Sequence, residues 1–259
     1  MMTEQCSYKE MVLNSAQLIV PREIYQRRMN AARVMKIAKN FDERVANEPK
    51  VSYRNDKYYV FDGQHTIAAR KLLNGGRDLP IKCKVYFNMS REEEALLFAQ
   101  QTGESAPLSA GSRLRALISG KDAEALSFLT ATKSVGLLLD YDQARGSYRI
   151  GCVQTAFNIY KKIGEERYKE AMAILANAWS GEPNSFRAEN VIGVSNFIDL
   201  YHGEYSSHRL LTQLRNVDPL TICRRGQAMG TGLSGYKKYL YQVYRIYNGS
   251  RKNVLPMKF

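Results

Sequence analysis

The chain has 259 residues, of which 44% are hydrophobic and 24% charged, and 38 Lys and Arg against 25 Asp and Glu give a formal net charge of +13. This composition is globular and excludes collagen-like, coiled-coil and wholly disordered chains. No apolar run approaches the roughly 18 residues that a membrane-spanning helix needs. Four scattered cysteines without a C-x-x-C pair argue against a disulfide scaffold or a zinc ribbon. We therefore expect a cytoplasmic protein with reduced thiols, no resident metal and no membrane partner.

Strand and helix patterns alternate in the first part of the chain. Residues 16–20 predict a short strand, and apolar side chains at three- and four-residue spacing predict an amphipathic helix over residues 30–45. Residues 51–54 and 57–61 predict two strands. The Asn-Asp pair between them tolerates positive φ at both positions, so the two strands are expected to form a tight hairpin.

The pattern continues with a helix over residues 64–73, which a pair of glycines at 75 and 76 should end. Residues 81–87 alternate as a strand. Ser90 to Glu93 has the form of a capping box and predicts a helix that ends near Gln101. This order of elements is typical of an α+β fold.

The second part of the chain has little strand signal. We expect an α+β domain, a small mixed sheet with helices, over residues 1–110, followed by a basic, all-helical region over residues 111–259. The segments with helical periodicity are residues 109–118, 122–130, 152–163, 166–178, 186–201 and 235–247.

The turn after the second hairpin strand is a candidate phosphate site. Asp62 and Gly63 end the strand, and Gln64, His65 and Thr66 open the next helix. Backbone amides at a helix N-terminus favour an anion, and glycine lets a phosphate approach the backbone closely. The alternative is that Asp62 caps an ordinary helix and His65 lies unused on the surface.

An ordered set of motifs gives this region a family resemblance. It comprises Pro21–Arg27, Val51–Arg54, the Asp-Gly-Gln-His signature at residues 62–65, Leu79–Val85 and Glu93–Gln100. Over roughly residues 11–118 the chain resembles the ParB/sulfiredoxin superfamily, in its ParB-like nuclease-domain branch. The resemblance implies a sulfiredoxin-like fold, and it is less specific for activity because this superfamily hosts several.

The resemblance also implies a nucleotide site. By analogy Gly63, Gln64, His65 and Thr66 contact phosphate, and a nucleoside triphosphate with Mg²⁺ is the implied cofactor. Partition ParB proteins carry Gly-Glu-Arg-Arg here, so Gln64, His65 and Thr66 replace an acidic residue and two arginines. A homodimer is compatible with the resemblance. The residues expected to flank the pocket are Tyr25, Gln26 and Arg27, and those expected to support the anion are Arg113 and Arg115.

A nuclease or nucleotide hydrolase of the same superfamily is the enzymatic alternative. Such an enzyme needs clustered carboxylates or histidines to hold a metal and activate water. The candidates are Asp62 and His65, with Glu104 as an acidic partner and Asp78 further away.

The C-terminal region is expected to contact DNA. No acidic residue follows Asp218, and a field of this sign attracts polyanions. Residues 236–247 interleave tyrosines with cations, which suits phosphate contact and base stacking, although a helix docked through its tyrosines is the alternative. Residues 188–198 superficially resemble a helix-turn-helix. The expected DNA contacts are Arg224, Arg225, Lys237, Lys238 and Arg245.

The sequence thus predicts a ParB-like DNA-binding protein of plasmid, phage or mobile-element type, with a phosphate- or nucleotide-binding turn at residues 62–66. The alternatives are a metal-dependent nuclease or nucleotide hydrolase, and a protein-interaction module whose charge only maintains solubility.

Overall fold

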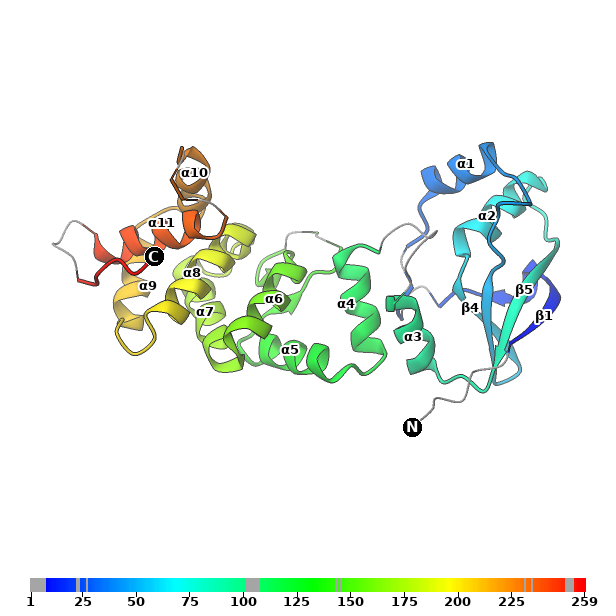
Figure 1. Ribbon diagram of the computed structural model, residues 1–259, viewed down its shortest axis with the longest axis horizontal. Coiled ribbons are helices and arrows are strands. Elements are labelled where there is room, and N and C mark those ends of the chain that lie inside the picture. Colours follow the sequence, from blue (N-terminus) through cyan, green and yellow to red (C-terminus); the bar gives the residue numbers. More distant parts are fainter. Residues whose placement is uncertain are drawn as a thin grey trace. The chain divides into compact units, whose positions relative to one another are not determined.

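The chain forms two compact units that divide after Asp122 (Figure 1). The first contains a mixed sheet with helices and the second is mostly helical, which confirms the predicted α+β class. The computed structural model describes residues 8–21, 24–26, 28–100, 108–142, 144, 146–230, 232, 233, 235–249 and 254–259.

The first unit contains a five-stranded sheet in the order β1-β5-β3-β4-β2. The β1–β5 and β3–β4 pairs are antiparallel, whereas β3–β5 and β2–β4 are parallel. The sequence pattern did not predict β1, because nearly all the side chains of this strand are exposed and only Leu13 is buried. The strands are β1 (Tyr8–Asn14), β2 (Leu18–Ile19), β3 (Lys50–Arg54), β4 (Lys57–Asp62) and β5 (Pro80–Phe87).

Local signals predicted several elements correctly. Asn55 and Asp56 have φ of 49° and 57°, as a tight hairpin between β3 and β4 requires. Helix α2 (Gln64–Leu73) has the predicted bounds. The capping box forms, because the Ser90 amide donates to Glu93 Oε2 at 2.7 Å and the Glu93 amide donates to Ser90 Oγ at 3.2 Å. This box opens α3 (Arg91–Gln100).

Two elements are shorter than the sequence predicted. The strand expected over residues 16–20 is reduced to β2, because the Asn14 side chain caps a 3₁₀ turn, η1 (Ser15–Gln17). The helix expected over residues 30–45 is α1 (Ala31–Lys39), which is capped by Asn40, and Asp42 Oδ1 accepts the Arg44 amide at 2.9 Å in a separate turn that follows.

Both faces of the sheet are buried. Val60 packs in a cluster with Ile67 of α2, whereas its neighbour Phe61 packs in a second cluster with Phe98 of α3 and Ala116 of α4 (Ala110–Ser119). Successive strand residues point to opposite faces. Helix α2 therefore covers one face of the sheet, and α3 and α4 cover the other.

Helix α4 belongs to the first unit. A Cβ atom at Gly120 would lie 2.6 Å from Leu96 Cγ, and the Ser119 hydroxyl donates to the Ile24 carbonyl at 3.0 Å. The compact units accordingly divide after Asp122, whereas the sequence placed the division after residue 110.

The second unit contains the other helices predicted for the C-terminal region and two that were not predicted, α9 and α10. The expectation of an all-helical region was wrong in one detail, because the two-residue strands β6 and β7 pair in parallel. None of the helices among the described residues combines the length and the hydrophobicity of a membrane-spanning segment. The elements are α5 (Ala123–Ser134), β6 (Leu138–Leu139), β7 (Arg149–Ile150), α6 (Val153–Ile163), α7 (Glu165–Ala178), η2 (Pro183–Phe186), α8 (Ala188–Leu200), α9 (Ser207–Arg215), α10 (Thr221–Ala228) and α11 (Lys237–Asn248).

The helix-turn-helix suggested for residues 188–198 is absent, because α8 runs unbroken through this segment. Gly193 is a packing position. A Cβ atom there would lie 2.9 Å from the Tyr239 carbonyl oxygen and 3.0 Å from Val243 Cγ2, so glycine permits the close approach of α11 to α8. Gly226 of α10 likewise permits close packing, here against the Tyr239 ring. A Cβ atom added at Gly226 would lie 2.7 Å from Tyr239 Cδ1.

We predict that Gly193→Ala destabilises the second unit by about 1 to 2 kcal/mol, because overpacking against a backbone carbonyl outweighs alanine's higher helix propensity. Urea unfolding followed by Trp179 fluorescence measures this, since Trp179 is the sole tryptophan and is buried in this unit. Gly230→Ala is the control, because nothing lies within 4 Å of its added Cβ. Unchanged or raised stability in Gly193→Ala would contradict the packing role.

Candidate functional site

The predicted phosphate turn connects β4 to α2. Gly63, the N-cap of α2, has φ of 93° and supplies no side-chain cap. The helical hydrogen bonds start with the Ile67 amide, which donates to the Gly63 carbonyl at 3.0 Å. Helix geometry therefore directs the amides of residues 64–66 out of the N-terminal end, where their partial positive charge favours an anion.

Glycine is required at position 63 by the backbone. The left-handed φ disfavours other residues, and an added Cβ would lie 3.0 Å from the Cα of Pro49. The turn is thus packed against the segment before β3. Thr66 is partly exposed at the same helix end, whereas Gln64 and His65 are only 3% and 5% exposed.

His65 joins the start of α2 to the start of α1. Its Nε2 accepts the Asn30 amide at 3.3 Å, and Asn30 caps α1 by accepting the Arg33 amide at 2.9 Å. The ring is therefore engaged inside the fold, which contradicts the alternative of an idle surface histidine. Two helix N-termini consequently meet at this residue.

Two of the residues expected to flank the pocket make buried contacts within the first unit. Gln26 is 1% exposed, and its Nε2 donates to the Val60 carbonyl at 2.9 Å. The Tyr25 hydroxyl donates to Glu94 Oε2 at 2.8 Å, and Glu94 also pairs with Arg54 at 2.6 Å. Burial and the Glu94 charge raise the pKa of Tyr25. Arg27 lies outside the described residues.

The supporting arginines lie on α4. Arg113 is exposed and Arg115 is partly buried. Their helix packs in the cluster that contains Tyr25 and Phe61, so it belongs to the same unit as the turn. Helix α4 covers the opposite face of the sheet from α2, and Gln26 and His65 make contacts inside the fold.

Acidic side chains near the turn have partners. Asp62 Oδ2 lies 3.7 Å from Lys50 Nζ, and Asp78 pairs with Lys71 at 2.7 Å. Glu104 lies outside the described residues. Over the described ranges, no three His, Cys, Asp or Glu side chains gather as metal ligands would.

The predicted DNA contacts on α11 share one face of the helix. At 3.6 residues per turn, Lys237, Lys238, Tyr241 and Arg245 fall within an arc of about 100°. Arg245 is exposed and the other three are partly buried. Tyr241 was not among the predicted contact residues, although helical periodicity places it among the cations. The opposite side is buried through Leu240, Val243, Tyr244, Ile246 and Tyr247.

The predicted contacts on α10 are also at the surface. Arg224 and Arg225 are exposed, while Ile222, Cys223 and Gly226 face the unit interior. Arg224 lies 3.8 Å from Asp218. Within the part of the chain that the structure describes, no acidic side chain pairs with Arg225 or with the three α11 cations.

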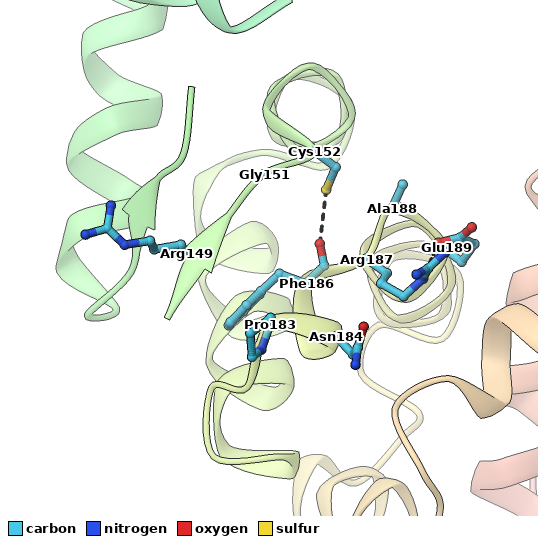
Figure 2. A pocket seen from close by; sticks show the side chains of 9 residues that line it. All are labelled: Arg149, Gly151, Cys152, Pro183, Asn184, Phe186, Arg187, Ala188 and Glu189. Atoms are coloured by element: carbon cyan, nitrogen blue, oxygen red, sulfur yellow. Dashed lines mark hydrogen bonds and ion pairs between the residues drawn. The ribbon is translucent and has the colours of Figure 1, made fainter. Parts of the chain in front are cut away.

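A pocket of about 270 Å³ lies between the starts of α6 and α8 (Figure 2). It was not predicted, because no local motif marks it. Arg187 Nε lies 3.3 Å from Glu189 Oε2, and Figure 2 shows Arg149 directed away from the other side chains. The Cys152 thiol donates to the Phe186 carbonyl at 3.3 Å, and burial raises its pKa to about 12. Cys152 is therefore a neutral thiol at physiological pH and a poor nucleophile.

A family model described as a family of unknown function (DUF6551) matches residues 20–259. The match spans nearly the whole chain and both compact units. No curated protein matches the chain. The comparisons therefore identify a family and leave its function to be argued from the residues.

We predict that Gly63→Ala loosens α2 more than Gly76→Ala does. Both positions have left-handed φ, at 93° and 79°, but only Gly63 faces a close neighbour, Pro49. Hydrogen exchange of peptides covering residues 57–73 measures the difference as faster exchange in Gly63→Ala. Equal exchange in the two variants would mean that Pro49 places no constraint on the turn.

Proposed function

The chain belongs to the family of unknown function DUF6551, and we propose that it is a DNA-binding protein of plasmid, phage or mobile-element type. In this proposal the basic face of α11, defined as Lys237, Lys238, Tyr241 and Arg245, holds the phosphate backbone together with α10. The first unit has a ParB/sulfiredoxin-like fold, and its turn at residues 62–66 binds a nucleotide or nucleic-acid phosphate.

One observation carries the proposal. The apolar side of α11 is buried against the rest of the second unit. Lys237, Lys238 and Arg245 lie on the outward side of the helix and have no acidic partners among the described residues. Some cations elsewhere are held in ion pairs, as Lys121 is with Glu92 at 2.6 Å. Unpaired cations on one face are available to replace the counterions around DNA phosphates.

The turn supports a second, separate contact. Backbone amides of residues 64–66 form the N-terminal end of α2, and the meeting of α1 and α2 at His65 adds a second positive helix end. The chain lacks the two arginines of the partition ParB signature, so amides and Thr66 would supply most of the phosphate contacts. A nucleoside triphosphate with Mg²⁺ is the ligand this part of the proposal names.

Two alternatives make different demands. A metal-dependent nuclease or nucleotide hydrolase would need metal ligands from outside the described residues. Asp62 and Asp78 are ion-paired, and among the described residues neither belongs to a group of three candidate metal ligands. A protein-interaction module would bind its partner with little dependence on salt, whereas phosphate contacts weaken steeply as salt rises.

We predict that replacing Lys237, Lys238 and Arg245 together by glutamine weakens binding to duplex DNA. The slope of log affinity against log salt should become shallower by about 2 to 3, since each phosphate contact contributes about 0.9. Fluorescence anisotropy of a labelled duplex over a salt series measures both effects.

The matched control replaces three ion-paired cations, Arg44, Lys121 and Lys169, by glutamine. It removes the same formal charge from other surfaces. The control should keep a slope close to that of the wild type. If both triple variants lose affinity equally, net charge alone explains the binding and α11 is not the contact surface.

We predict that Thr66→Glu abolishes triphosphate binding without unfolding the turn. A carboxylate in the first turn stabilises a helix by about 0.3 to 1 kcal/mol but repels phosphate. Calorimetry with CTP, ATP and GTP, each with Mg²⁺ and with or without duplex DNA, provides the measurement. Thr66→Gln is the neutral control and should bind as the wild type does. Equal binding by Thr66→Glu would exclude the turn as the phosphate site.

A further inference from the structure

A column of aromatic rings extends from the core of the second unit to the basic face of α11. Phe197 and Tyr201 of the core lie with ring centroids 5.0 Å apart. Tyr201 and Tyr244 are stacked at 6.2 Å, and Tyr244 and Tyr241 are stacked at 6.4 Å with their planes 26° apart. Tyr241, the only partly exposed ring of these four, forms the outer end of the column.

The inner rings are fixed in place. The Tyr201 hydroxyl donates to the Pro256 carbonyl at 2.7 Å, and the Tyr244 hydroxyl donates to the Leu255 carbonyl at 3.2 Å. Phe259 packs edge-on against Tyr244 at 5.9 Å. A ring that stacks on a fixed neighbour loses little further freedom when a ligand binds to it.

The three cations of the basic face surround Tyr241. Lys237 and Lys238 precede it by four and three residues and Arg245 follows it by four, so all three are its neighbours on the helix surface. An aromatic ring among cations matches the chemistry of a nucleotide, which joins a flat base to a phosphate.

We propose that Tyr241 is a stacking platform for an unpaired base, and that the basic face of α11 binds single-stranded nucleic acid. This inference rests on the proposed contact between that face and phosphate. The base would extend the aromatic column by one ring, while Lys237, Lys238 and Arg245 contact the flanking phosphates.

The arrangement favours a single strand over a duplex. In a duplex each base is covered by its neighbours in the stack, so its flat face is hidden from a side chain on a rigid helix. An unpaired base exposes this face, and stacking tolerates any base because every base has one. The shared ligand chemistry is an unpaired base with its phosphates, from DNA or RNA.

Anisotropy with four labelled probes tests this inference: (dT)₁₂, (rU)₁₂, an abasic deoxyribose-phosphate 12-mer and a 12-bp duplex. Tyr241→Leu should weaken (dT)₁₂ binding by about 5- to 100-fold, because it removes the stacking face. It should leave the abasic and duplex probes within twofold. Tyr241→Phe keeps the ring and should bind (dT)₁₂ as the wild type does.

Tyr58→Leu is the matched control, since Tyr58 is a partly buried ring packed on Tyr53 at 4.9 Å in the first unit. It should not change binding to any probe, and Trp179 fluorescence checks that Tyr241→Leu remains folded. Equal wild-type affinity for (dT)₁₂ and the abasic 12-mer would overturn the stacking inference and leave phosphate binding intact. Failure of all four probes would overturn the proposed function itself. The ratio of (dT)₁₂ to (rU)₁₂ affinity assigns the strand to DNA or RNA.

Discussion

The close approach of α11 to α8 at Gly193 is the constraint on which the second unit depends. The Tyr239 carbonyl occupies space that any side chain at position 193 would need, so the two helices meet backbone to backbone. This contact fixes the rotation of α11 about its axis. Its apolar side then faces the core, and Lys237, Lys238 and Arg245 face outward. Tyr241 lies among these cations through its spacing on the helix, and the same rotation leaves its ring partly exposed.

The first unit achieves a fixed geometry by different means. A buried network joins Tyr25 and Arg54 through Glu94, and Gln26 holds the preceding segment to β4. These bonds satisfy polar groups that would otherwise be costly to bury. The Gln26 bond holds β4 in place shortly before the turn. The left-handed φ of 93° at Gly63 then sets the direction in which α2 starts. Gln26 and His65, which the sequence suggested as ligands, therefore make contacts inside the fold. The backbone amides of residues 64–66 remain the groups suited to binding an anion.

The sequence predicted those features whose causes lie within a few residues. The hairpin at Asn55 and Asp56, the bounds of α2 and the capping box at Ser90 all depend on local backbone preferences. Features with distant causes were missed or misread. β1 is a strand because it pairs with β5, and Gly193 suggested a turn because the helix that requires it lies elsewhere in the chain. The sequence pointed to Gln26 and His65 as residues near the turn. It did not indicate their hydrogen-bond partners, the Val60 carbonyl and the Asn30 amide, because these lie in other segments of the chain.

We propose that the outward face of α11 is the nucleic-acid contact surface, and lysine footprinting is the sharpest experiment on this proposal. The protein is acetylated with and without saturating DNA, and each lysine is quantified by peptide mass spectrometry. We expect DNA to protect Lys237 and Lys238 while Lys121 and Lys169, which are ion-paired elsewhere, react at unchanged rates. Unchanged reactivity of Lys237 and Lys238 in the presence of bound DNA would mean that DNA binds to another surface.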